Sequence, residues 1–422
     1  MEQIIKEVES LDAEKLMSII RTLISVDTTN PPGNTYREYI DIISPFFKEL
    51  GYTLDEIVIP DEFTKQIPYP IEGPRINLVA TKDYGQESYV CFYGHMDVVP
   101  APNDGEKKWR YPPFEAKMTK AGKIFGRGVA DMKGSMACLL LALQIIEKLN
   151  LKPKFNIRVL NCTDEELGVY PGVKYLEELG YVKDIVFSMD GGIRPMIPIG
   201  TAGDLVVVVE TIGRSSHSGM NLWGINALEE MIPILNELIE LKKIVEKREC
   251  KDIPGVPNFK TGEKRNMSPN LNLDMIRSGD KANIIPDLCR LTIDRRYMPD
   301  ERYEDVKQEI QEAIDRGRTK SKALDVRTRY IHAYPPFRND PNSPGNLRHK
   351  KVLSLIQQVS ENEINVIGTS GSTDMGTLTG YDVIIHGLIG PGSNTHGVNE
   401  YTKLSDAKMF IKELITFLCA DL

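Results

Sequence analysis

The residue types that bind divalent metal ions recur at particular places in this sequence of 422 residues. His95 and Asp97 come directly after the apolar run 89–92, which predicts a buried parallel strand. Because residues i and i+2 of an extended chain point to the same side, the carboxylate of Asp97 can orient the imidazole of His95 while that ring holds a metal. The first prediction is therefore a metal site at the end of this strand.

Five further candidates follow predicted strands or begin a predicted helix: Asp131, Glu165, Glu166, Asp190 and His396. Taken singly, each candidate also has a structural interpretation, such as a core histidine, a helix N-cap, a solvated turn or a surface loop. Their convergence on one edge of a sheet favours a shared metal site instead. Histidines and carboxylates without cysteine suit zinc, cobalt or manganese.

Strands alternating with helices must position these residues. The apolar segments 76–81, 89–94, 155–162 and 185–189 predict strands, and 132–149 and 171–179 predict helices, the first with Asp131 in an N-cap-like position. This alternation predicts a parallel or mixed α/β sheet flanked by helices. In such sheets, functional groups gather at the carboxyl ends of the strands.

The pattern changes near residue 200. Strands at 204–212, 271–277, 289–296 and 324–331, with helices at 225–245 and 302–316, follow the ferredoxin-like order β-α-β-β-α-β. We therefore predict an α+β domain at 203–332, inserted into an α/β catalytic domain formed by 1–202 and 333–422. After the insertion, we expect a strand at 364–367, a helix at 373–379, a strand at 382–388 and a final helix at 405–419.

The composition excludes several classes of protein. Apolar residues make up 41% and charged residues 27%, as in soluble globular proteins. The net charge of −8, without a dense Lys/Arg block, argues against a nucleic-acid partner. A polar start and the absence of a long apolar run predict neither a signal peptide nor a membrane span. Six scattered cysteines, without a CxxC pair, suit reduced thiols in the cytoplasm.

Four motifs give the chain a resemblance to a known family. They are Gly94-His95-Met96-Asp97-Val98-Val99-Pro100, Gly126-Arg127-Gly128 with Asp131-Met132-Lys133-Gly134, Asp164-Glu165-Glu166, and Thr395-His396-Gly397. In order and spacing they resemble the dinuclear-zinc amidohydrolases, which include acetylornithine deacetylase, succinyl-diaminopimelate desuccinylase, aminoacylase, glutamate carboxypeptidase and several dipeptidases. The resemblance covers essentially the whole chain and implies a zinc-exopeptidase-like catalytic domain with an inserted lid and dimerisation domain.

The resemblance also implies roles for the candidates. Asp131 would bridge two divalent ions, zinc or otherwise cobalt or manganese. His95 and Asp190 would complete one ion, and Glu166 and His396 the other. Asp97 would orient His95. Glu165 would be the general base for a hydroxide that bridges the ions and attacks an amide carbonyl.

Further residues match family positions that contact the substrate. His217 would stabilise the oxyanion, often from the partner subunit of a homodimer, although a surface-turn histidine is the structural alternative. Asn283 and Arg296 would bind the substrate, and Arg296 could instead pair with Asp294 or Asp300. A loop of backbone N–H groups and hydroxyls would hold the substrate carboxylate, or simply cap a helix: Ser370, Gly371, Ser372 and Thr373.

The favoured function is hydrolysis of an N-acyl amino acid, a small molecule with a free carboxylate. Asp190 departs from the glutamate usual in the family's deacylases and carboxypeptidases, and aspartate is commoner in its aminopeptidases and dipeptidases. A dipeptidase or carboxypeptidase of the same family is the alternative. A non-catalytic binding protein on this fold would be expected to lack Glu165 or a ligand, and all these positions are filled.

Overall fold

The computed structural model describes residues 2–102, 108–192, 196–257 and 261–422. The chain forms two compact units. Unit 1 comprises Met1–Pro198, Asn339–Val366 and Leu378–Leu422, and unit 2 comprises Ile199–Arg338 and Ile367–Thr377. The predicted inserted domain, 203–332, thus lies within unit 2. The short segment 367–377, which the sequence placed in the α/β domain, also belongs to unit 2.

The main sheet of unit 1 has six strands in the order β1-β2-β6-β3-β7-β17. Strands β3, β6, β7 and β17 run parallel, whereas β1 and β2 are antiparallel to their neighbours, so the sheet is mixed. The strands are β1 (Thr53–Val58), β2 (Ile76–Lys82), β3 (Tyr89–His95), β6 (Asn156–Cys162), β7 (Ile185–Ser188) and β17 (Asp382–Ile385).

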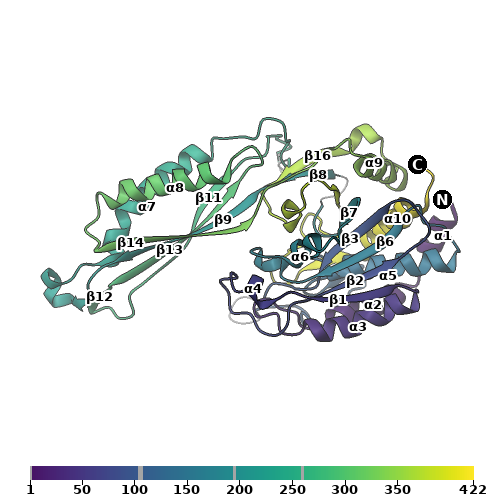
Figure 1. Ribbon diagram of the computed structural model, residues 1–422, viewed down its shortest axis with the longest axis horizontal. Helices are drawn as coiled ribbons and strands as arrows, with labels where there is room; N and C mark the ends of the chain where they lie inside the picture. The colour runs from purple at the N-terminus through teal and green to yellow at the C-terminus, as the bar shows by residue number, and fades with distance from the viewer. Residues whose placement is uncertain (1, 103–107, 193–195, 258–260) are drawn as a thin grey trace. The chain divides into compact units, whose positions relative to one another are not determined.

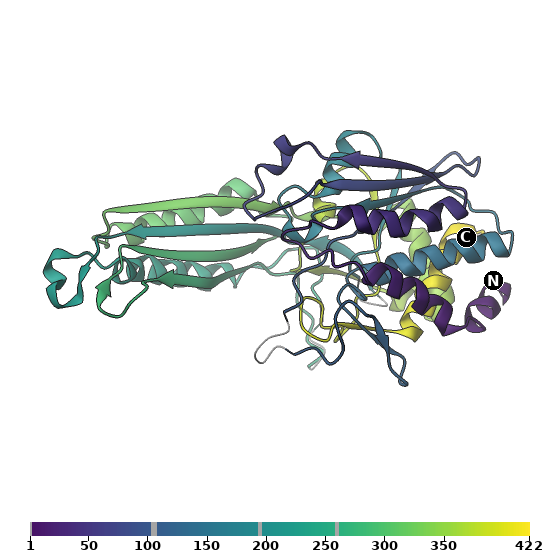
Figure 2. The ribbon, with the colours of Figure 1, turned by 90° about the horizontal axis from the view of Figure 1, so that it is seen from below.

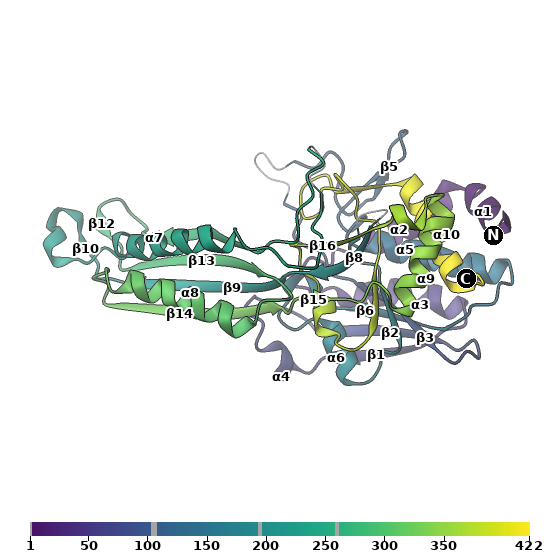
Figure 3. The ribbon, with the colours of Figure 1, turned by 90° about the horizontal axis from the view of Figure 1, so that it is seen from above.

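Helix α5 (Lys133–Lys148) lies at the centre of unit 1, and 13 of its 16 residues are buried. A helix that is apolar nearly all round must be enclosed by other elements, and α5 packs against β3 and two helices, α2 and α10. The two chain ends lie side by side in Figures 1 to 3. The other helices of unit 1 are α1 (Glu2–Glu9), α2 (Ala13–Ile24), α3 (Tyr36–Glu49), α4 (Asp61–Thr64), α6 (Gly172–Glu178), α9 (Pro344–Gln357) and α10 (Leu404–Cys419).

Unit 2 has the predicted ferredoxin-like arrangement. Its sheet runs β11-β13-β9-β14, with every neighbour antiparallel. Both helices cover one face of this sheet, as Figure 3 shows from the helix side and Figure 2 from the opposite side. Alternate residues of β9, Leu205, Val207 and Val209, point into the core beneath the helices. The elements are β9 (Gly203–Ile212), α7 (Ala227–Val245), β11 (Asn270–Ser278), β13 (Leu288–Tyr297), α8 (Tyr303–Arg318) and β14 (Asp325–Tyr334).

Three small sheets complete the fold. Unit 1 holds β4 (Lys117–Met118), β5 (Lys123–Phe125) and β18 (Tyr401–Lys403). At one end of unit 2, β10 (Ser216–His217) pairs with β12 (Ile284–Ile285) and is followed by the 3₁₀ helix η2 (Ser218–Trp223). The third joins β8 (Met196–Thr201), β15 (Phe337–Arg338) and β16 (Asn365–Thr369). Pairing within this third sheet explains why the segment after β16 belongs to unit 2.

Two local predictions are wrong. The helix expected at 373–379 is only a 3₁₀ turn, η4 (Asp374–Thr377), in which the hydroxyls of Thr373 and Thr377 hydrogen-bond to the backbone of Met375 and Asp374 and so compete with helical bonds. Asp131 does not cap helix α5, since Met132 occupies the N-cap position. The carboxylate of Asp131 faces two histidines instead. Within the described part of the chain, every helix is too short or too polar to cross a membrane.

Candidate metal centre

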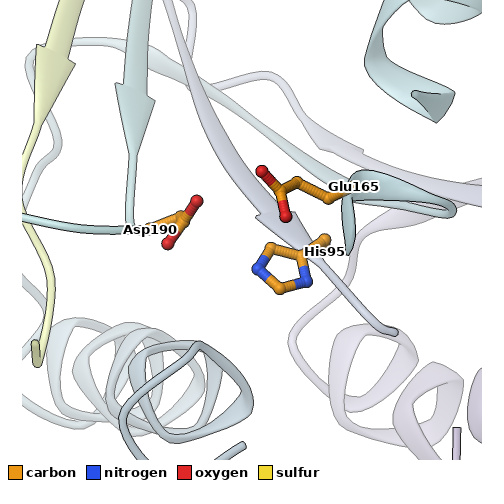
Figure 4. A group of neighbouring side chains, drawn as sticks. All are labelled: His95, Glu165 and Asp190. Atoms are coloured by element: carbon orange, nitrogen blue, oxygen red, sulfur yellow. The ribbon is translucent and has the colours of Figure 1, made fainter. Parts of the chain in front are cut away.

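Three neighbouring strands deliver the first group of candidate ligands. Strand β3 ends at His95, β6 leads into the 3₁₀ turn η1 (Glu165–Leu167), and β7 ends two residues before Asp190. Because β3 lies between β6 and β7 and runs parallel to both, the carboxyl ends of the three strands meet at one edge. Figure 4 shows the carboxylates of Glu165 and Asp190 gathered around the ring of His95. One ligand atom from each of the three lies within 4.8 Å of the others.

Asp131 and His396 extend this group. The Nε2 atom of His95 lies 3.2 Å from Oδ1 of Asp131, and the Nε2 atom of His396 lies 3.2 Å from Oδ2 of the same carboxylate. His396 is also 3.3 Å from Oε2 of Glu166. Each oxygen of Asp131 therefore faces a different imidazole. A carboxylate in this position can share one oxygen with each of two metal ions.

Asp97 acts mainly on the main chain of its neighbours. The Nδ1 atom of His95 lies 3.0 Å from the backbone oxygen of Asp97 and 3.6 Å from its carboxylate. A proton on Nδ1, donated to that backbone oxygen, leaves Nε2 as the ligand atom. The carboxylate of Asp97 accepts the backbone N–H groups of Glu165 at 3.3 Å and Glu166 at 3.0 Å. It thereby fixes the turn that carries both glutamates.

A further buried acid, Asp164, and an asparagine, Asn30, support this turn, a role that the sequence predicted for neither. The side-chain amide of Asn30 donates to Asp97 at 3.0 Å and to Asp164 at 2.9 Å. Asp164 also accepts from the hydroxyl of Tyr36 at 3.0 Å and lies 3.4 Å from the guanidinium of Arg75. Asp164 adopts a left-handed φ of +61°, a conformation that clusters at functional sites. Asn30 begins the stretch Asn30-Pro31-Pro32-Gly33, whose prolines and glycine are typical of a turn.

The charges of the site suit divalent cations. Five carboxylates, those of Asp97, Asp131, Glu165, Glu166 and Asp190, share this edge with two imidazoles, so negative charge exceeds positive even if both rings are protonated. Such an excess in a largely buried site calls for cations, and imidazole nitrogens with carboxylate oxygens are suitable donors for zinc, cobalt or manganese. The residues present therefore fit a pair of divalent metal ions.

The pKa shifts of His396, His95 and Glu166 show the same preference, because each of them favours the binding of a proton. Hydrogen bonds to Asp131 and Glu166 raise the pKa of His396 to about 11, although its side chain is 58% exposed. Burial by itself disfavours the charged form of His95, but Asp131 and Asp97 raise its pKa well above the ordinary range. For Glu166, burial and the neighbouring Asp131 raise the carboxyl pKa. A metal ion would take the place of these protons.

Unit 2 brings Arg296 together with the 370–373 loop. One nitrogen of Arg296, Nη1, donates to the hydroxyl of Ser372 at 2.8 Å. The Nε and Nη2 atoms grip Asp294 at 2.8–3.2 Å, and Nη2 lies 3.2 Å from Asp204. Hydrogen bonds therefore occupy both edges of the guanidinium. The pairing with Asp294 is the structural alternative that the sequence offered for Arg296. In the same loop, Ser370 donates to the backbone of Ser268, Gly371 donates to the hydroxyl of Thr369, and Thr373 is buried.

His217 and Asn283 meet at the other end of unit 2, where β10 pairs with β12. The backbone N–H of Ser218, next to His217, donates to the backbone oxygen of Asn283 at 3.0 Å. His217 is exposed, and its Nδ1 accepts the N–H of Gly219 at 3.1 Å. Within unit 2, the candidates thus form two separate pairs, one at each end of the long strands.

Comparison with known proteins agrees with this geometry. The chain is 27% identical to N-formyl-4-amino-5-aminomethyl-2-methylpyrimidine deformylase of Bacillus subtilis, over 96% of this chain and 94% of that protein. It is 28% identical to a probable succinyl-diaminopimelate desuccinylase of Staphylococcus aureus, over 81% and 84%. The solved structure of a dipeptidase from Saccharomyces cerevisiae shares the fold, with a TM-score of 0.80, 17% identity, and coverage of 99% and 97%.

The model of the peptidase family M20/M25/M40 matches residues 91–419, which include all five candidate metal ligands. The family resemblance and the fold predicted from the sequence are thereby confirmed. The chain belongs to peptidase family M20/M25/M40 and is a hydrolase.

Proposed function

We propose that this hydrolase removes the acyl group from an N-acyl amino acid or a related N-acyl amine. The observation that carries the proposal is the position of Glu165, buried at the same strand edge as His95 and Asp190. A carboxylate there can move protons, while the neighbouring Glu166 faces His396 and the bridging Asp131. The names of the two relatives, a deformylase and a desuccinylase, support removal of an acyl group from nitrogen.

We assign five residues to two divalent ions, of which zinc suits the nitrogen and oxygen donors. His95 and Asp190 would hold one ion, Glu166 and His396 would hold the other, and Asp131 would serve both. When bound, such ions polarise an amide carbonyl and acidify a water molecule. Asp97 keeps the ring of His95 and the Glu165–Glu166 turn in place through the contacts described above.

Glu165 transfers the proton that the reaction requires. Its carboxylate takes a proton from the attacking water as the water oxygen bonds to the amide carbon. It then gives that proton to the leaving nitrogen as the C–N bond breaks, so that an acid and an amine are released. We propose that His217 of the partner subunit donates a hydrogen bond to the carbonyl oxygen as negative charge develops there.

The substrate's carboxylate is assigned to the loop of Ser370, Gly371, Ser372 and Thr373, with Asn283 of the partner subunit as a further substrate contact. Because both edges of Arg296 are already engaged, Arg296 supports this loop through Ser372. A dipeptidase or carboxypeptidase is the second candidate, and the aspartate at position 190 favours the dipeptidase.

We also propose that the protein is a homodimer joined through unit 2. Helix α7 exposes an apolar stripe, with Leu228, Ile232 and Ile239 each 40–50% exposed. Ile232 follows Leu228 by four positions and Ile239 follows Ile232 by seven, so the three lie on one side of the helix, where a second copy can pack. None of the six cysteines forms a disulfide, which supports a reducing cytoplasmic location.

A turnover screen on protein loaded with zinc or cobalt tests the proposal. N-formyl, N-acetyl and N-succinyl amines are compared with free-amine dipeptides, with and without a chelator. Chelator-sensitive cleavage of the acylated set is expected, and cleavage of dipeptides alone would make the protein a dipeptidase. Glu165→Ala should retain both metals and lose about 10²–10⁴-fold in kcat, whereas the surface variant Glu178→Ala should behave as wild type. Full turnover by Glu165→Ala would exclude Glu165 as the proton carrier.

A further inference from the structure

A buried ion pair between Arg127 and Glu400 lies beside the proposed metal ligands and has no part in the reaction described above. Strand β18 pairs with β5, so that Tyr401 faces Phe125 and the next position along places Glu400 against Gly126. The backbone N–H of Gly126 donates to the backbone oxygen of Glu400 at 3.1 Å. Both charged side chains are buried, with Glu400 at 0% and Arg127 at 2% exposure.

The carboxylate of Glu400 organises the loop that ends at Asp131. Its Oε1 atom accepts the backbone N–H groups of Gly128 at 3.1 Å, Ala130 at 2.9 Å and Asp131 at 3.2 Å. Its other oxygen lies 2.6 Å from Nη1 of Arg127. Three backbone donors of one short loop thus converge on a single oxygen. The last of them belongs to the residue whose carboxylate faces both His95 and His396.

Arg127 extends these contacts to the other ligand-bearing segments. Its Nη2 atom donates to the backbone oxygen of Gly397, the residue after His396, at 3.2 Å. It also donates to the backbone oxygen of Pro100, in the segment that leaves β3 after His95 and Asp97, at 3.2 Å. The ion pair therefore contacts three loops, and each of them carries or follows a proposed ligand.

A buried ion pair is a poor source of stability, because removing two charges from water offsets most of their attraction. Such a pair does fix geometry, because each of its hydrogen bonds requires a particular position of the partner. Here the partners are backbone groups of the ligand loops. Groups that hold metal ligands in place commonly change metal affinity when they are altered.

We propose that Glu400 is a positioning residue for the metal centre. It holds Asp131 through the backbone of the 128–131 loop, and through Arg127 it ties the loop of His396 and the segment after His95 to the same point. This inference rests on the proposed roles of Asp131 and His396 as metal ligands. Since Asp131 serves both ions, a disturbance at Glu400 should weaken the binding of both.

The test measures metal affinity rather than turnover. The variants Glu400→Gln and Glu400→Ala are titrated with Zn²⁺ against a chromophoric chelator, and the absorption spectrum of the Co²⁺-loaded protein is recorded. A glutamine keeps the size of the side chain, but its single amide oxygen cannot serve both the three N–H groups and Arg127. Both variants should bind both ions about 10–100-fold more weakly, with altered Co²⁺ bands.

Glu301→Gln is the matched control. It weakens the ion pair between the buried Arg295 and the partly buried Glu301 of unit 2, which lie 2.7 Å apart. This variant should unfold more easily while it binds metal as the wild type does. Wild-type metal affinity in Glu400→Gln, with only a loss of stability, would overturn the proposal.

Arg127→Lys provides a second route if Glu400→Ala does not fold. A lysine keeps the charge but cannot reach both Pro100 and Gly397 with one planar group. Weaker binding, chiefly of the ion next to His396, is expected, and unchanged affinity for both ions would overturn the proposal. Failure of the wild-type protein itself to bind two ions would instead refute the proposed metal centre, so the two failures are distinguishable.

Discussion

Replacing Asn30 with alanine should destabilise the protein and impair the metal centre together. Asn30 is 1% exposed, and its side-chain amide donates to Asp97 at 3.0 Å and to Asp164 at 2.9 Å. Both carboxylates are fully buried. The substitution removes one hydrogen-bond donor from each of two buried carboxylates. It also removes the amide that donates to both and thereby offsets their mutual repulsion.

The magnitude follows from these two bonds. A hydrogen bond to a charged group contributes about 1.5–3 kcal/mol to stability, which gives an upper range of about 3–6 kcal/mol for the pair. The remaining donors reduce the loss, because Asp97 keeps two backbone N–H groups and Asp164 keeps Tyr36 and Arg75. We therefore expect the free energy of unfolding to fall by about 3 kcal/mol.

The loss should also reach the catalytic groups. Asp97 carries the turn of Glu165 and Glu166 through their backbone N–H groups, and a misplacement of about 1 Å can lower a rate about 10²-fold. Urea denaturation measures the free energy of unfolding. Turnover during a titration with metal measures both metal affinity and the activity of the metal-loaded site. Asn346→Ala is the control, because Asn346 is equally buried and bonds only to neutral groups away from these loops.

The control should lose stability without losing metal affinity or turnover per folded molecule. A stability loss below about 1 kcal/mol in Asn30→Ala would refute the assignment of two charge-assisted bonds. Unchanged turnover and metal affinity in a clearly destabilised Asn30→Ala would refute the link from Asn30 through Asp97 to the glutamates.

Three further predictions concern unit 2. His217→Ala should lower kcat by about 10²–10³-fold with unchanged metal content, and an unaltered kcat would make His217 a surface-turn residue. Arg296→Ala should raise KM for substrates with a free carboxylate more than for their amidated analogues, because it releases Ser372, and equal losses on both would indicate a purely structural role. Burial raises the pKa of Asp204 from 3.8 to about 6 against the opposing effect of Arg296. Since the folded carboxyl then binds its proton more tightly than the unfolded one, this group makes stability fall as pH rises from about 4 to about 6. Asp204→Asn should remove that fall in urea titrations at the two pH values, and an identical pH dependence in both proteins would contradict it.

Much of the fold was accessible from the sequence because its signals are local. The order and periodicity of the apolar segments predicted both the mixed α/β sheet and the ferredoxin-like sheet, and the strands that end at His95 and before Asp190 begin and end within a few residues of the predicted positions. The transfer of 367–377 to unit 2 depends on pairing among β8, β15 and β16, which no local pattern signals. The close approach of Gly376 to Pro335 is likewise a tertiary outcome: an added Cβ on Gly376 would lie 2.2 Å from the backbone oxygen of Pro335.

The same division applies to the site. By itself the sequence determined which residues we propose to carry the chemistry, because the candidate ligands follow strand ends and their motifs are short and continuous. Only the tertiary structure decided what holds them. Asn30 reaches Asp164 across 134 positions, and Glu400 accepts the N–H of Asp131 across 269. A buried amide or carboxylate is stabilised by whichever donors the fold brings to it, and that choice is made by the packing of distant loops rather than by the residues next to it in the chain.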